Sequence, residues 1–254
     1  MTKSQLTIEV ADQFVQFTSF QGDTVQQQVI IQINLSDESI RKEELSTCFE
    51  KNSFLSIDFD EISLSYASKE SSLVPNSIFA ESTPDSIFKL CFGEPKEKYS
   101  VDFNRISELS IVNIYTIPDW LKRFFVLKFP RIIIQHEGTH GLRKILNSET
   151  FHLKVSLMFH ANYFCMTIVK HSNLEFYSFF DYQNDDDIIY HVLFALQQKE
   201  LVNEKGILEL IHGIDSNTKS FVDLKGKFKK IKELASLEVN EKNNFIAQSQ
   251  LLCV

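Results

Sequence analysis

Glycine is scarce in this chain, with seven copies among 254 residues. None of them forms G-x-G-x-x-G or G-x-x-x-x-G-K-[ST], the loops in which closely spaced glycines let backbone N–H groups approach a phosphate. The sequence therefore excludes an ordinary Rossmann dinucleotide-binding domain and an ordinary P-loop nucleotide hydrolase.

Cysteine is also scarce, and the four copies lie far apart in the sequence, at Cys48, Cys91, Cys165 and Cys253. No two of them form C-x-x-C, so the spacing indicates neither a disulfide framework nor a thiolate metal site. The first ten residues contain no apolar signal core. We therefore expect a protein of the reducing cytoplasm.

Long apolar runs and positive net charge are absent as well. No stretch approaches the about 18 consecutive apolar residues of a membrane span, so we expect no membrane partner. The net charge of −8 makes nucleic acid an unlikely partner, because phosphate binding needs clustered Lys and Arg. The one basic run, residues 225–233, carries apolar residues at helical spacing and predicts an amphipathic helix with exposed lysines.

The residues that are present indicate a globular protein with a substantial core. Hydrophobic residues make up 43% of the chain and charged residues 24%, which excludes disorder over its whole length. Phenylalanine occurs 23 times, and we interpret it as core material that other proteins take from Leu or Val.

The order of predicted elements occurs twice. Alternation predicts strands at 6–11, 13–20 and 25–33, followed by a helix over 35–52 with Ser36 as N-cap, and a strand at 54–60. The second copy has strands at 151–157, 161–170 and 173–182, a helix capped by Asn184, and a strand at 207–213. Short connections predict an antiparallel meander in each copy.

The region between the copies predicts an insertion and a domain boundary. Residues 108–135 read as strand, helix and strand, and a short helix follows from Thr139. Residues 68–86 predict a loop that contains a short helix. We expect two domains: 1–150, the first half with the insertion, and 151–254, the second half with the C-terminal amphipathic helix.

Several segments carry a family resemblance, namely "LTIEVADQFVQF", "SLVPNSIF", "SIVNIYTIPDWL", "FPRIIIQHEGT" and residues 151–187. Together they resemble an uncharacterised bacterial family, a domain of unknown function, over about residues 6–222. The resemblance implies an α+β or α/β fold, a duplicated actin-like ATPase (ribonuclease H-like) fold. Each half would be a three-stranded antiparallel meander followed by helix and strand. The family offers no agreed catalytic residues to transfer.

His136, Glu137 and His140 match H-E-x-x-H, a zinc-protease pattern that needs both histidines on one helix face. Here a β-branched run precedes His136 and predicts a strand, while Gly138 and Thr139 suit a turn and a helix N-cap. The histidines would then flank a strand-to-helix junction, and the longer zinc pattern lacks its third ligand. We interpret the match as chance and expect no metal.

The resemblance also implies where a nucleotide would bind. Actin-like ATPases hold phosphates at the turn between the first two strands of each half, commonly with Asp followed by Gly. The first turn keeps Asp12 but has Phe14 where a small residue belongs. The second turn, "FHANYF", has neither Asp nor Gly, and we expect Phe164 beside it. Gly213 stands alone at the adenosine contact. Asp12 and Gly213 are therefore degenerate cofactor-binding positions, and we expect no cofactor.

Three functional hypotheses follow. The first is a catalytically silent pseudo-ATPase, an actin-like binding or scaffold protein with an unknown protein partner and weak or absent nucleotide binding. The second is a diverged nucleotide-binding ATPase or phosphotransferase. The third is a metal-dependent hydrolase at the H-E-x-x-H match. Asp12, Asp58 and Asp60 could also converge as the metal-binding carboxylates of a ribonuclease H-like nuclease, but we interpret them as ordinary strand-end acids.

Overall fold

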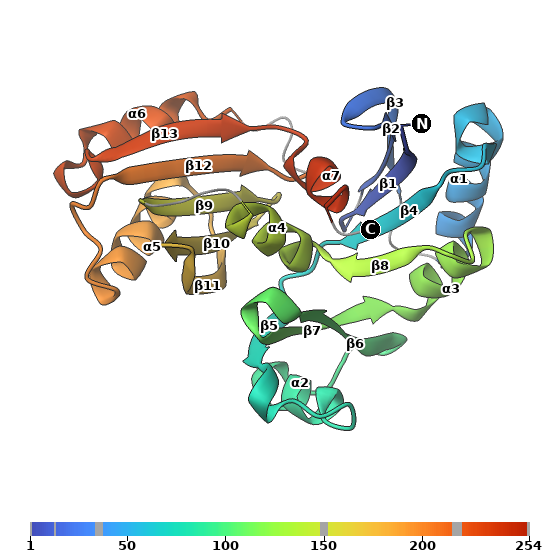
Figure 1. The fold of residues 1–254 in the computed structure, drawn as a ribbon, viewed down its shortest axis with the longest axis horizontal. Coiled ribbons are helices and arrows are strands. Elements are labelled where there is room, and N and C mark those ends of the chain that lie inside the picture. Colours follow the sequence, from blue (N-terminus) through green and yellow to red (C-terminus); the bar gives the residue numbers. More distant parts are fainter. Residues whose placement is uncertain (1, 13, 34–37, 148–151, 215–219, 253–254) are drawn as a thin grey trace. The chain divides into compact units, whose positions relative to one another are not determined.

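The computed structural model describes residues 2–12, 14–33, 38–147, 152–214 and 220–252. The chain divides into two compact units: unit 1 is Met1–Gly141 with Ile246–Val254, and unit 2 is Leu142–Phe245. Each unit contains one five-stranded mixed sheet (Figure 1). None of the helices in the described part of the chain has both the length and the apolar character needed to cross a bilayer.

The main sheet of unit 1 begins with an antiparallel meander and continues with parallel strands. Its strand order is β3-β2-β1-β4-β8. The meander strands pair antiparallel, β4 pairs parallel to β1, and β8 pairs parallel to β4. The strands are β1 (Ser4–Val10), β2 (Phe14–Gln21), β3 (Thr24–Gln32), β4 (Glu61–Tyr66) and β8 (Ile133–His136).

Two helices, α1 (Glu38–Lys51) and α3 (Asp119–Lys128), contribute to the core of unit 1. Phe17 of β2 meets Phe49 of α1 edge-on, with ring centroids 5.4 Å apart. Phe125 of α3 is fully buried in the same cluster. The aromatic residues therefore fill the core, as the composition predicts. The predicted N-cap Ser36 lies outside the described residues.

Unit 2 repeats this plan with the strand order β11-β10-β9-β12-β13. Its helices α5 and α6 pack into one core with the sheet. The predicted Asn184 cap is confirmed, because its side chain accepts hydrogen bonds from the backbone N–H groups of Asp186 and Asp187. The elements are β9 (Leu153–Phe159), β10 (Tyr163–Lys170), β11 (Asn173–Asp181), α5 (Asp185–Gln198), β12 (Gly206–His212), α6 (Val222–Lys230) and β13 (Leu237–Lys242).

The duplication extends to individual hydrogen bonds. In unit 1 the N–H of Ala67, just after β4, donates to the carbonyl of Val10 at 2.8 Å. In unit 2 the N–H of Gly213, just after β12, donates to the carbonyl of Phe159 at 2.9 Å. Val10 and Phe159 are the last residues of β1 and β9. The two meanders belong to separate sheets of the same order, so the predicted duplicated fold is confirmed.

A small sheet with the order β5-β7-β6 is inserted in unit 1. Helix α2 packs on it around Phe88, which is fully buried with Val112 and Ile114. The predicted loop over 68–86 is therefore partly wrong, since five of its residues form a strand paired with β7. The elements are β5 (Ser71–Pro75), α2 (Pro84–Phe92), β6 (Tyr99–Ile106) and β7 (Ile111–Pro118).

The predicted strand at 54–60 is wrong. Residues Ser53–Ser56 form a 3-10 helix, and strand β4 begins only at Glu61. Both segments alternate apolar and polar residues, but only the later one pairs in register with β1, where Leu64 lies opposite Ile8. Ile57 is 55% exposed, which a strand in the middle of the sheet would not allow.

The C-terminal part of each predicted half differs in detail from the structure. Helix α4 (Glu137–Leu146) begins two residues earlier than expected. Strand β13 and helix α7 (Phe245–Gln250) had no counterpart in the sequence prediction. From α7, Gln250 accepts a hydrogen bond from Ser63 of β4 at 2.7 Å within unit 1. The boundary between residues 150 and 151 stays a prediction.

Candidate functional site

The turn after β1 is the first predicted phosphate contact. Asp12 is exposed in this turn, and Phe14 begins β2 half-buried. The backbone N–H of Ala11 donates to the carbonyl of Phe14 at 3.0 Å, which closes the turn. One of the N–H groups at the tip of this hairpin is therefore already used inside the protein.

Asp12 lies in a charged neighbourhood of unit 1. The ammonium of Lys96 pairs with Glu70 at 2.9 Å. This hydrogen bond is the main cause that raises the pKa of Lys96, and the negative charge of Asp12 adds to it. Burial is the main cause that raises the pKa of Tyr66, to which Asp12 also contributes. Lys96 therefore supplies positive charge near Asp12, the one carboxylate at the two turns where an actin-like ATPase would hold phosphate.

The turn after β9 is the second predicted phosphate contact. The backbone N–H of His160 donates to the carbonyl of Tyr163 at 2.8 Å, as Ala11 does in unit 1. The His160 ring is fully buried and stacks on the Tyr163 ring at 4.4 Å. Phe164 lies beside the turn as expected, opposite Phe159 at the end of β9, but its side chain is fully buried in the core of unit 2. The aromatic residue at this turn is Tyr163.

Gly213 follows β12 and lies against the end of β9. A Cβ at this position would stand 2.6 Å from the carbonyl oxygen of Phe159 and 3.1 Å from Cε1 of His160. The end of β9 therefore lies so close to residue 213 that only glycine fits there without a shift of the backbone. Gly213 and His160 meet in unit 2, whereas Asp12 belongs to unit 1.

The H-E-x-x-H residues span a junction, as predicted, with His136 at the end of β8 and Glu137 and His140 in α4. All three are buried. Nδ1 of His136 accepts from the backbone N–H of Gly138 at 2.9 Å, and its Nε2 lies 2.8 Å from the carbonyl oxygen of Ser68. Because an amide N–H can only donate, Nε2 carries the proton. Both ring nitrogens are therefore engaged. Among the described residues, no group of three His, Cys, Asp or Glu side chains could hold a metal ion.

A buried polar network surrounds His136, and no sequence pattern predicted it. Asn113, fully buried on β7, donates to Thr139 Oγ1 at 3.1 Å and contacts His136 Nδ1 at 3.2 Å. Its Oδ1 accepts from the Ser71 hydroxyl at 2.6 Å. Asn104 Oδ1 accepts from the His136 N–H at 2.7 Å and from Thr139 at 3.1 Å. The network links β5, β6 and β7 to the β8–α4 junction, and gives the histidine a structural role.

The other acidic candidates do not converge. Asp60 accepts from the backbone N–H and the hydroxyl of Ser4 at 2.8 and 2.9 Å, and these bonds hold its pKa below the ordinary value. Ser4 opens β1, whereas Asp12 follows its end. At about 3.3 Å per residue, β1 from Ser4 to Val10 is about 20 Å long, so Asp60 and Asp12 lie at opposite ends of this strand. Asp12 and Asp60 therefore do not converge, and the three residues Asp12, Asp58 and Asp60 do not form a ribonuclease H-like metal site. This agrees with their interpretation as ordinary strand-end acids.

These features define the class of protein: two duplicated sheets, each an antiparallel meander continued by parallel strands, are the actin-like ATPase fold. A model of one family, described as "Protein of unknown function (DUF3822)", matches residues 1–231. The chain belongs to this family. The comparison with curated proteins gives no significant match.

Two solved structures illustrate the shared fold. A Bacteroides thetaiotaomicron protein with an actin-like ATPase fold and unknown function has a TM-score of 0.79 at 19% identity, and the alignment covers 100% of this chain and 97% of that one. The PilM–PilN type IV pilus biogenesis complex has a TM-score of 0.55 at 10% identity, with coverage of 96% and 89%. At these identities the likeness concerns the fold.

Proposed function

We propose that this protein is a catalytically silent actin-like module that binds a protein partner in the cytoplasm. The observation that carries the proposal is the use of backbone N–H groups at the strand ends where an actin-like ATPase binds phosphate. Those of Ala11 and His160 close their own turns, and those of Ala67 and Gly213 donate to the ends of β1 and β9. Without glycine in either turn, rearranging them to face a phosphate is costly.

The charges near Asp12 support the same proposal. A catalytic ATPase needs a carboxylate that orders a magnesium ion or a water. Here Lys96, paired with Glu70, supplies positive charge from within the protein. The second turn offers His160, Ala161 and Asn162 and no carboxylate. The chain therefore has the fold of an ATPase, but at its first turn Lys96, and not a magnesium ion, supplies the positive charge near Asp12.

A binding role accords with one further observation. The PilM–PilN structure, which shares the fold, is a complex of two proteins, and this is the kind of role that we propose here.

The alternative is a diverged ATPase or phosphotransferase, favoured by the fold alone. Phosphate release from ATP with Mg²⁺ separates the two proposals. We expect release at the rate of the buffer control for the wild type and for Asp12→Ala. Magnesium-dependent release by the wild type that Asp12→Ala abolishes, with the exposed turn variant Asp23→Ala unaffected, would establish the enzyme instead.

A further inference from the structure

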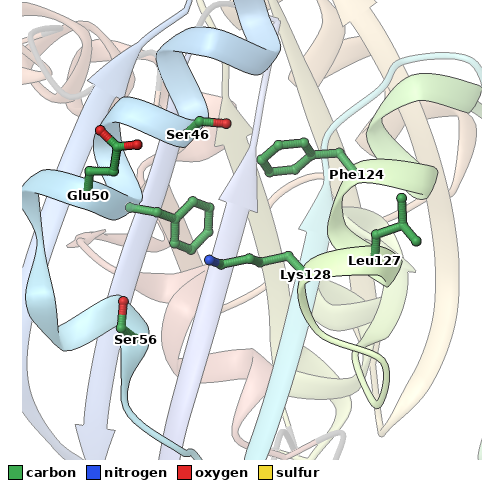
Figure 2. A pocket seen from close by; sticks show the side chains of 7 residues that line it. Ser46, Glu50, Ser56, Phe124, Leu127 and Lys128 are labelled. Carbon is green, nitrogen blue, oxygen red and sulfur yellow. The ribbon is translucent and has the colours of Figure 1, made fainter.

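A cavity opens on unit 1 between α1 and α3, on the side of the main sheet that these helices cover (Figure 2). Its volume is about 430 Å³. Phe49 and Phe124 give it aromatic walls, and Ser46 and Ser56 add hydroxyl groups. It is therefore large enough to receive apolar side chains from outside.

Apolar side chains also project beside this cavity. Leu127 on α3 is 83% exposed and the neighbouring Val126 is 43% exposed. Leu127 itself lines the rim of the cavity. An exposed leucine next to an apolar hollow gives one surface both a projecting and a receiving part, which is the requirement for a self-complementary twofold contact.

The charges on the two walls have opposite sign and stand on different helices. Glu50 lies on α1 and Lys128 on α3 (Figure 2). The Lys128 ammonium lies 4.6 Å from the centre of the Phe49 ring. Within the described residues neither Glu50 nor Lys128 forms an ion pair. In a twofold contact across this face, Glu50 of each copy can meet Lys128 of the other.

We propose that the α1–α3 face, defined as Glu50, Phe49, Phe124, Leu127 and Lys128, binds a second copy of this chain. Leu127 of each copy enters the cavity of the other, and two reciprocal Glu50–Lys128 pairs flank it. The reciprocal charges distinguish this occupant from a small apolar ligand, which would leave Glu50 unpaired. The proposal does not depend on the absence of ATP binding.

Sedimentation analysis of the whole chain tests the proposal. We expect a monomer–dimer equilibrium with a dissociation constant of about 1–100 µM. Leu127→Asp should weaken it by at least about 100-fold, because two leucines per dimer lose their burial. The matched control is Leu90→Asp on α2, since Leu90 is 87% exposed and lies outside the face. This control should dimerise as the wild type does.

A charge exchange tests the geometry of the contact. Glu50→Lys and Lys128→Glu each place like charges opposite one another twice, and each should weaken dimerisation about tenfold or more. The double variant restores opposite charges and should return to within about threefold of the wild type. A wild type that stays monomeric, a dimer that Leu127→Asp leaves intact, or a double variant no better than the single ones would overturn the proposal.

Discussion

The Nε2–H group of His136 donates to the carbonyl oxygen of Ser68 at 2.8 Å, across 68 positions of sequence. This bond and the one from the Gly138 N–H to Nδ1 occupy both ring nitrogens. A histidine that looks like a zinc ligand in the sequence is thereby part of a buried polar network.

The Asn113 side chain connects three other members of the network, Ser71, His136 and Thr139. Asn113→Ala removes the hydrogen-bond acceptor of the buried Ser71 hydroxyl and one of the two partners of Thr139, which keeps its bond to Asn104. We expect a loss of about 2–4 kcal/mol in the free energy of unfolding. Urea denaturation measures this loss. The control Asn173→Ala, at an exposed position, should cost less than about 0.5 kcal/mol. Equal effects of the two substitutions would contradict the role of the network.

The engagement of His136 predicts that the H-E-x-x-H residues hold no zinc. Elemental analysis of the protein after dialysis should find far less than one zinc per chain. Added Zn²⁺ should leave the unfolding midpoint unchanged, since a ligand that binds only the folded state would raise it. Near-stoichiometric zinc that is lost in His140→Ala would show this interpretation to be wrong.

Two glycine substitutions should act in opposite directions. Gly213→Ala places a Cβ 2.6 Å from the Phe159 carbonyl oxygen and should destabilise the protein by about 1–3 kcal/mol. Gly226→Ala, inside helix α6 with nothing within 4 Å of the added Cβ, should stabilise it by about 0.4–1 kcal/mol. Thermal unfolding distinguishes the two signs. A neutral Gly213→Ala would refute the packing reason for this glycine.

The cap of α5 predicts a dependence on pH. Backbone N–H groups of Gln183 and Asn184 hold the pKa of Asp187 below its ordinary value. The charged form is thus favoured in the folded state, and its contribution is present above the unfolded pKa of about 4 and is lost as the pH falls through the folded pKa. Asp187→Asn should therefore lower stability at pH 7.

The same substitution should make little difference at the acid end. Urea midpoints at pH 7 and at about pH 3 give the comparison, with the wild type and Asp187→Asn converging as the carboxylate is protonated. Asp223→Asn, in the first turn of α6, is the matched control and should change the midpoint less at pH 7. A gap between wild type and Asp187→Asn that persists unchanged at low pH would contradict the capping role.

Much of the fold could be predicted because its signals are local. The Asn184 cap and the alternating strands of each meander depend on neighbouring residues, and both were found. The prediction of a strand at 54–60 was wrong because this segment and the next one, Glu61–Tyr66, alternate apolar and polar residues equally well. Pairing with β1, a contact between distant parts of the chain, selects the second segment.

The candidate site could be predicted less well. Asn104 and Asn113 lie in apolar strands and have partners up to 42 residues away, such as Ser71, so no spacing rule connects them. The reason for Gly213 is likewise a backbone approach to Phe159 rather than a sequence motif. Phe164 lies beside its turn as expected, but the sequence did not indicate that its side chain faces the core, because neighbouring residues of a strand point to opposite faces.

Calorimetric titration with ATP, with and without Mg²⁺, tests the proposed function most directly. The internal use of the strand-end N–H groups and the nearby Lys96–Glu70 pair predict no binding tighter than about 1 mM, a free energy near −4 kcal/mol. Asp12→Ala should then leave the titration unchanged, and so should the control Asp23→Ala. Micromolar binding of ATP that Asp12→Ala abolishes and Asp23→Ala preserves would contradict the proposal of a silent binding module.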